Sequence, residues 1–280
     1  MIQIRIFATM APASSAFVFV LLAAAAASSA AAAASSAAAA AFVAPPRRPL
    51  AHRPSVSATL RSSPEQPPED LQEVFSSAGW KPTKADLDTC PLFTVANGEG
   101  QPLQYSVGSS SLPFFFVDVD DAKEELAKAK SDPELSGMEL MDRMDIIPFP
   151  LGAAFEMWAR DEAAVVPSKA SIQAAGAPPD ANPMGQAVPL FACLSITQED
   201  EKTGRPALPL FFDRGDAEDA VREATELDGG DADDMPIEVL SLEGAVRMLT
   251  GTVKGDNPEV GFRFLPSNKS VRHIQEYLGG

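Results

Sequence analysis

The chain has 280 residues, with 39 acidic residues against 22 basic ones and a formal net charge of −17. The first 64 residues hold five arginines and no acid, so residues 65–280 keep 17 basic and 39 acidic residues, a net charge of −22. This charge repels phosphate, which excludes nucleic acid and electrostatic binding to anionic lipid, and favours cationic or apolar partners. The roughly 215 residues after the leader suffice for one large domain or two small ones.

The leader has the parts of two targeting segments in series. Residues 1–41 resemble a secretory signal peptide, since Arg5 precedes the apolar run AFVFVLLAAAAA and small residues lead to a cleavage point between Ala41 and Phe42. A membrane anchor is the alternative, because the run approaches the roughly 20 residues of a spanning helix. Residues 42–63 are rich in Arg, Ser and Pro and free of acids, which is typical of an organelle transit peptide.

The next segments predict a spacer and then strands. Residues 64–87 read as a Pro-rich spacer and a short helix that Gly79 stops. PLFTVAN predicts a strand, NGEGQ a turn, and PLQYSV its hairpin partner at 102–107. The continuous apolar run LPFFFVDV at 112–119 predicts a central strand.

Two helices and an edge strand follow in the first half. Acids at the start of DVDDAKEELAKAK favour a helix, whose apolar face holds Ala122, Leu126 and Ala129. Pro148 and Pro150 confine DIIPFPL to an edge strand or to the end of a strand. A second helix begins at Leu151, and its apolar stripe, expected in the core, also holds Ala154, Phe155 and Trp158.

The second half repeats this pattern. VPLFACLSIT corresponds to PLFTVAN, LPLFFDRGDAEDAV to LPFFFVDVDDAKEEL, and MPIEVLSLEGAVRML to DIIPFPLGAAFEMW. In the second helix, all five apolar positions match at one offset, and Met157 corresponds to Met248. The expected fold is therefore α+β: two pseudo-twofold-related, strand-rich repeats forming a mostly antiparallel or mixed sheet flanked by helices.

These repeats define the expected organisation of a single domain at 88–280. The repeats run over 88–158 and 188–250, and a linker at 159–187, rich in Ala, Pro and Gly, is expected on the surface. A closing strand and helix occupy 258–278. Ser267 is expected to cap this helix, whose apolar face would hold Val271, Ile274 and Leu278.

The closing segment VGFRFLPSNKSVRHIQEYL resembles that of the Tic 22 kDa subunit family, soluble components of chloroplast protein import with cyanobacterial relatives. PLFTVANGEGQPL and PLFFDRGDAEDAV are similar to other phrases of the family, and together they cover most of residues 88–278. The family motif falls on five residues here: Phe262, Arg263, Phe264, Leu265 and Pro266. The acid that follows this Pro in the family is Ser267 in this chain.

The resemblance implies a chaperone-like binding component that assists precursors across the plastid envelope, between the outer and inner translocons. Its partners would be precursors with basic transit peptides and plastid translocon subunits. The junction AAFVAP, with Phe42, resembles the address of algae with complex plastids. The implied location is the envelope intermembrane space of a complex plastid, soluble or peripherally attached. Peripheral membrane association and a homodimer stay open.

The sequence shows no set of residues with the types and spacing of a catalytic, cofactor-binding or metal-binding site. His273 reads as a surface residue on the last helix, and Cys193 as a buried inert thiol, while Cys90, at a strand start, could be more exposed. Whether the two cysteines pair stays open. The acids of LDGGDADD read as a solvated turn without the spacing of a calcium loop. We therefore expect no enzyme, no cofactor and no metal.

Three functions remain to be weighed. The first is the import component, for which Met157 and Met248, off the apolar stripe of their helices, are the candidate client contacts. The second is a plastid enzyme or small-molecule module with a site between the two repeats, which needs convergent polar groups in a cleft. The third is a purely structural subunit that bridges two complexes.

Overall fold

The computed structural model describes residues 3–4, 71–107, 110–132, 143–199, 204, 206–228, 231–251 and 261–279. The expected signal peptide, its cleavage point at Ala41 and Phe42, and the transit peptide at 42–63 fall outside these ranges, apart from a two-residue strand, β1 (Gln3–Ile4). Within the described ranges, no helix has the length and apolarity needed to cross a bilayer.

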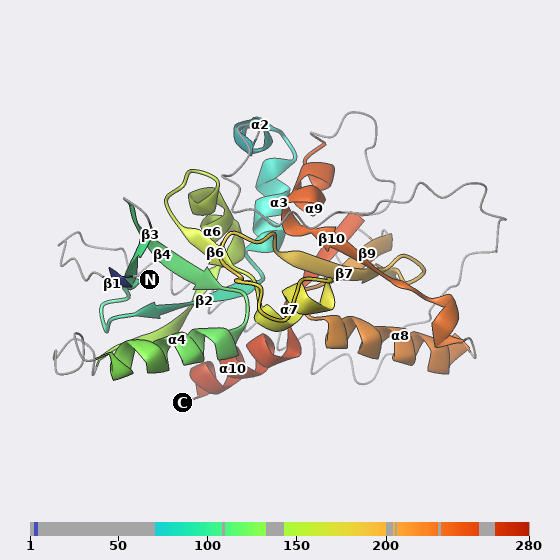
Figure 1. Ribbon diagram of the computed structural model, residues 1–280. Coiled ribbons are helices and arrows are strands. Elements are labelled where there is room, and N and C mark those ends of the chain that lie inside the picture. Colours follow the sequence, from blue (N-terminus) through green and yellow to red (C-terminus); the bar gives the residue numbers. More distant parts are fainter. Residues whose placement is uncertain are drawn as a thin grey trace.

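The strands form two sheets, one from each half of the chain (Figure 1). The first has the order β1-β3-β4-β2-β5, with β6 also paired to β4. Its bounds are β2 Pro91–Ala96, β3 Gln104–Val107, β4 Ser110–Phe116, β5 Asp145–Pro150 and β6 Ala164–Val166. The second has the order β10-β7-β9-β11, with β8 paired to β9. Its bounds are β7 Pro189–Cys193, β8 Gln198–Glu199, β9 Pro206–Phe211, β10 Ile237–Ser241 and β11 Gly261–Leu265.

The two sheets share one pattern of pairing. β5-β2-β4-β6 and β10-β7-β9-β11 are each antiparallel, antiparallel and then parallel. Even the register agrees, because Phe93 pairs with Phe116 in the first sheet and Phe191 with Phe211 in the second. The α+β fold with two similar repeats is confirmed, with a separate mixed sheet in each repeat.

Helices cover both faces of the sheets. In Figure 1, α4 (Val119–Ser131), α7 (Lys169–Ala174), α8 (Arg214–Asp228) and α10 (Asn268–Gly279) lie below the strands. Above them lie α2 (Leu71–Ser76), α3 (Trp80–Leu87), α6 (Leu151–Trp158) and α9 (Leu242–Leu249), while a 3₁₀ turn, η2, spans Ala232–Asp234. The result is three layers, with strands between two layers of helices.

Alternation along the strands divides the buried residues between these layers. Leu92 and Phe115 face upward and join residues of the second sheet, such as Leu210, in one cluster, which we call the shared core. Their neighbours Phe93 and Phe116 face down toward α4. The described members of the four buried clusters all lie between Leu71 and Ile274, within the body of the chain.

Helix α3, which the sequence did not predict, packs between α6 and α9. Two glycines permit the close approach. A Cβ on Gly152 would lie 2.6 Å from Asp88 Oδ1, and one on Gly79 would lie 2.8 Å from Thr250 Cα. The Trp80 indole N–H donates to Glu156 Oε1 at 2.9 Å, which fixes α3 against α6.

The expected surface linker at 159–187 is wrong in part. It contains β6 and α7, which correspond to the closing strand and helix β11 and α10. VVPSKASI and FLPSNKSV match across the two, and Ser168 and Ser267 each accept a hydrogen bond from the main-chain N–H three residues later. The composition hid these elements because β6 has only three residues and α7 six.

Each closing helix reaches the other repeat. At the end of α7, Ala174 accepts a hydrogen bond from Arg214 and packs beside Phe191 of the second sheet. On α10, Ile274 is buried in the cluster around Phe93 of the first sheet. Because Lys169 of α7 also contacts α4 and Asn268 of α10 contacts α8, each closing helix spans both repeats.

Two further expectations need correction. The segment after the NGEGQ turn pairs with β2 only at its start, where Ala96 and Pro102 form a bridge and the Leu103 N–H donates to the Val95 carbonyl at 2.7 Å, and then, as β3, it pairs with β4. On α10, Ile274 is buried, whereas Val271 and Leu278 are each 37% exposed, since the helix covers the first sheet with only its inner side. The Ser267 cap, the edge position of β5 and the buried face of α4 are as predicted.

Candidate functional site

A groove of about 240 Å³ lies at the outer side of the first repeat. Residues from β3, β4, β6, α4, the start of α7 and the segment at 182–184 line it. Met184, Pro183 and Asn182 of that segment form its rim, and they belong to the second part of the interval expected as a linker.

Aromatic residues form the floor of the groove. Phe114 and Phe116 project from the same face of β4, because they are two residues apart. Tyr105 on β3 lies opposite Leu112 and therefore diagonally beside Phe114, and the two rings stack with centroids 4.0 Å apart. Val166 completes an apolar surface suited to a hydrophobic side chain.

The wall of the groove is charged. Asp121, Glu125 and Lys128 lie on one face of α4 at intervals of four and three residues. Burial raises the pKa of Asp121 and of Glu125 above the usual carboxyl range. Asp121 Oδ2 also accepts the main-chain N–H of Lys169 at 3.2 Å, which holds the start of α7 against the wall.

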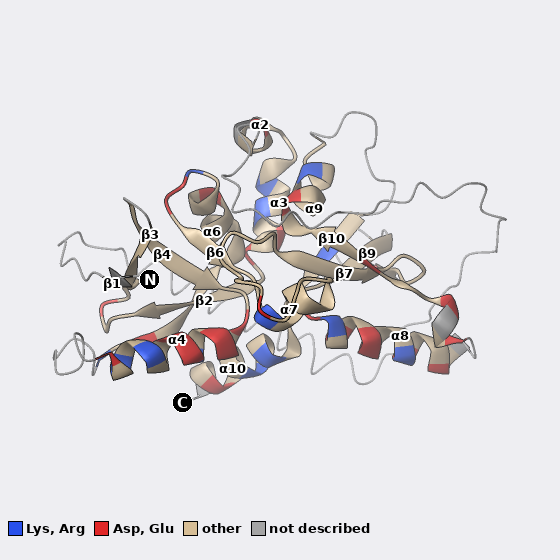
Figure 2. Cartoon of the chain, in the orientation of Figure 1, with Lys and Arg blue, Asp and Glu red and all other residues tan. Residues whose placement is uncertain are grey.

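Glu124 lies next to this wall, and its pKa is shifted in the opposite direction from those of Asp121 and Glu125. Its carboxylate contacts Lys128 Nζ at 2.8 Å and Lys169 Nζ at 3.1 Å. Hydrogen bonds from these two ammonium groups hold the pKa of Glu124 below its usual value. Figure 2 shows acidic and basic residues interspersed along α4 at this side of the molecule.

The Tyr105 hydroxyl is the unusual group of the floor. Its oxygen is buried and has no hydrogen-bond partner among the described residues, and burial raises the pKa of this phenol. A buried hydroxyl without a partner costs free energy, which a bound donor or acceptor would recover.

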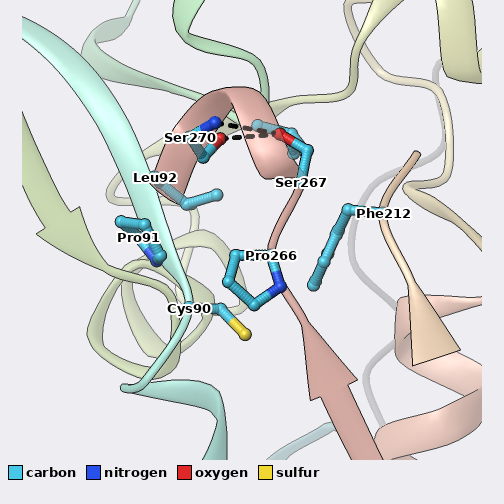
Figure 3. A pocket seen from close by; sticks show the side chains of 8 residues that line it. Cys90, Pro91, Leu92, Phe212, Pro266, Ser267 and Ser270 are labelled. Atoms are coloured by element: carbon cyan, nitrogen blue, oxygen red, sulfur yellow. Dashed lines mark hydrogen bonds between the residues drawn. The ribbon is translucent and has the colours of Figure 1, made fainter. Parts of the chain in front are cut away.

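A cavity of about 10 Å³, the size of one water molecule, lies at the junction of the two repeats. Figure 3 shows Cys90, Phe212 and Pro266 around it, with Ser267 and Ser270 joined by hydrogen bonds. A small-molecule site between the repeats therefore finds no room in this cavity.

The family motif lies in β11, beside this junction. Phe264 is buried in the shared core and Phe262 packs against it, while Arg263 points away into solvent. Leu265 pairs with Phe211 of β9, and Pro266 reaches the junction cavity. Four of these five residues thus belong to the last strand of the second sheet, and Pro266 follows directly after it.

The methionine pair lies apart from the groove. Met157 is on α6 and Met248 on α9, at equivalent positions in the upper layer of helices. Both are half-buried, and Met157 packs against the shared core. They are not brought together with any residue of the groove.

The reactive residue types are placed as follows. Cys90 and Cys193 are both buried and free, and burial raises the pKa of Cys90 to about 12. His273 differs from its expected surface position, since its ring packs edge-on against Phe93 at 5.5 Å and its Nε2 is buried, with no partner in the described part of the chain. Desolvation lowers the pKa of His273, so its neutral form is favoured.

Within the described ranges, no cluster of His, Cys, Asp or Glu could hold a metal ion. The groove offers apolar contact, acidic groups and an unpartnered hydroxyl, without a nucleophile paired to a base. Such a set of groups binds a chain segment by shape and charge. Sequence patterns did not reveal it, although the run FFF and the spacing of Asp121, Glu125 and Lys128 were visible.

Comparison with known proteins identifies relatives of the whole body. The sequence profile of the Tic22-like family matches residues 19–276, which confirms the resemblance of the closing segment. Tic22 from Plasmodium falciparum has 18% identity and a TM-score of 0.57, covering 71% of this chain and 98% of that one. Anabaena Tic22, described with protein transport, has 18% identity and a TM-score of 0.53, covering 70% and 96%. No curated protein sequence matches.

Proposed function

Because this chain belongs to the Tic22-like family, we propose that it is a chaperone-like binding component of the plastid protein-import machinery. It assists precursor proteins across the envelope between the outer and inner translocons. Its partners are precursors with basic transit peptides and subunits of those translocons. Its location is the envelope intermembrane space of a complex plastid, soluble or peripherally attached.

The groove of the first repeat carries this proposal. A transit peptide is basic and partly apolar, and the groove joins an aromatic floor to a wall with Asp121 and Glu125. The body of the chain adds a net charge of −22, which attracts a basic segment from a distance. Charge then mainly speeds capture, and apolar contact holds the segment.

The methionine pair is a second proposed contact. Met157 and Met248 are flexible apolar side chains at equivalent places in the two repeats, and neither is fully buried. A client that lies across the upper layer of helices would meet both. This contact and the groove are separated by the sheets, so variants can test them independently.

Suppression of aggregation is the direct test. Residues 65–280 are mixed with several unfolded client proteins, and light scattering follows their aggregation. We expect slower aggregation at stoichiometric amounts, and a weaker effect at high salt, which screens the capture step. No protection of any client would contradict the proposal.

Location is tested separately in an alga with a complex plastid. The full chain and forms lacking residues 1–41 or 1–63 are tagged and located by immunogold labelling. The full chain should label the envelope, and the form without residues 1–41 should stay in the cytosol. Labelling of the full chain at the cell surface would contradict the proposed address.

A further inference from the structure

The outer edge of β3 binds an extended segment of this same chain. β1, residues Gln3–Ile4, pairs antiparallel with β3, so that Gln3 lies opposite Ser106 and Ile4 opposite Tyr105. Figure 1 shows β1 beside β3 at the outer side of the first sheet. The other edge of β3 is occupied by β4.

The segment on this edge comes from the leader. In sequence, residues 2–6 read IQIRI, the alternation of a strand, and they belong to a leader with five arginines and no acid. This is the composition that the proposed clients carry in their own transit peptides. The leader's contact with β3 is thus an example, within one chain, of the contact that a client would make.

Removal of the leader would leave β3 as an edge strand. The described members of the four buried clusters all lie between Leu71 and Ile274, so residues 65–280 supply this core themselves and we expect them to keep it when residues 1–64 are absent. The main-chain N–H and C=O groups that face β1 then lose their partners. An edge with unpaired main-chain groups is a template for an added strand.

We propose that β3 of the mature chain binds an extended precursor segment by strand addition, antiparallel and in the register that Gln3–Ile4 occupies. The inference rests on the proposed function and names the way in which the client is held. Main-chain hydrogen bonds supply affinity without demanding one sequence, which suits a component that receives many precursors.

The edge and the groove form one continuous surface. Tyr105 belongs to β3 and also to the floor of the groove. In an antiparallel pair, directly opposite residues project from the same face of the sheet. The client residue opposite Tyr105 therefore lies on the groove side, where an apolar side chain meets Phe114 and Met184.

Two other strands, β5 and β8, are less suited to an added strand. β5, at the opposite edge of the first sheet, contains Pro148 and Pro150, which lack an N–H. β8, which corresponds to β3 in the second repeat, has only two residues, Gln198–Glu199. The β3 edge has four residues and no proline.

Peptides with methylated main-chain nitrogens test the proposal. A labelled peptide with the sequence of residues 1–8 is titrated with residues 65–280 by fluorescence anisotropy. Two further versions carry N-methyl groups on alternate residues: one version on the odd-numbered residues and the other on the even-numbered residues. Only alternate N–H groups of an added strand face its neighbour, so one version should lose at least tenfold in affinity and the other should bind nearly as well. Equal affinity of all three peptides would overturn strand addition.

A disulfide tests the register. The variant Ser106→Cys is mixed with the peptide carrying Gln3→Cys, under mild oxidation. Cys90 and Cys193 are buried and should not compete. The control is Ser131→Cys, exposed at the end of α4. We expect fast cross-linking at 106 and little at 131, whereas equal rates would contradict the register.

The cross-linked form separates this inference from the proposed function. With the peptide fixed at 106, the edge is filled, and protection of clients from aggregation should fall at least severalfold, while peptide attached at 131 should leave it unchanged. If residues 65–280 protect clients, the filled form protects equally well and the peptides show no phase dependence, strand addition is wrong and the proposed function stands. If residues 65–280 protect no client, the proposed function fails, and the peptide titration and the cross-link still decide whether the edge binds a strand.

Discussion

The Ser171 hydroxyl donates a 2.8 Å hydrogen bond to the main-chain carbonyl of Phe212, which joins the closing helix of the first repeat to the end of a strand in the second. Both residues are buried. The variant Ser171→Ala leaves that carbonyl without its partner, and we expect the free energy of unfolding to fall by about 1–2 kcal/mol in urea titrations. Thr225→Ala, which removes an exposed bond within α8, should change it by less than about 0.5 kcal/mol. Equal losses would show that the bond between the repeats adds nothing.

Gly152→Ala tests the contact of α3 with α6. Alanine normally favours a helix over glycine by about 1 kcal/mol. Here the new methyl would lie 2.6 Å from Asp88 Oδ1 and 2.8 Å from the Lys84 carbonyl, so the clash should prevail and lower the free energy of unfolding by about 1–3 kcal/mol. Gly98→Ala, with its nearest neighbour at 4.0 Å, is the matched control. A more stable Gly152→Ala variant would mean that the two helices can separate freely.

Glu125→Gln should be more stable than the parent chain at pH 7. Burial raises the pKa of Glu125 above its usual 4.5, so its charged form costs stability once the pH exceeds that value. As the pH falls through the raised pKa toward 4.5, the carboxyl becomes neutral in the folded chain and the advantage of Gln disappears. Urea titrations from pH 4 to pH 7 measure this difference.

Glu124→Gln should show the opposite sign. The pKa of Glu124 is lowered by hydrogen bonds from Lys128 and Lys169, so its charge stabilises the fold above the usual value of 4.5 and this contribution is lost as the pH falls through the lowered pKa. At pH 7 the variant should therefore be less stable than the parent. Matching signs for the two neighbouring variants would contradict the described wall of the groove.

Three methionine variants locate the client contact. Met184→Ser removes an apolar side chain from the rim of the groove and should weaken binding of a basic, apolar peptide about five- to tenfold, from roughly 1–1.5 kcal/mol of lost burial. Met157→Ser and Met248→Ser report on the upper layer of helices. If only Met184 matters, the groove is the contact, and if only the other two matter, the methionine pair is. Thermal melts show whether each variant is folded.

The spacing of apolar residues and the internal repeat of the sequence were enough to predict the greater part of the fold. The face of α4 with Ala122 and Ala129, the edge strand with Pro148, and the matching of the helices α6 and α9 all follow from local pattern. Each depends on residues close together in the chain. A strong local pattern is the kind of information that one sequence carries.

The groove could not be predicted because its residues come from distant segments. Tyr105 and Met184 meet only through the order of the strands and the path of the chain after α7. The short β6 and α7 gave too few residues for a period, so their correspondence with β11 and α10 went unseen, although VPSKAS and LPSNKS are alike. Helix α3 was missed because its apolar face is narrow, with only Trp80, Thr83 and Leu87 buried.

The closing helices that span both repeats have a consequence for how such a molecule can be divided. A fragment that ended near residue 187 would keep Phe93 but lose Ile274, which covers it, and its own α7 would have no second sheet to pack against. Cutting the chain between the repeats therefore exposes apolar surface on both pieces. The covalent link keeps each repeat beside the surface that it covers, at an effective concentration that two separate pieces would not reach.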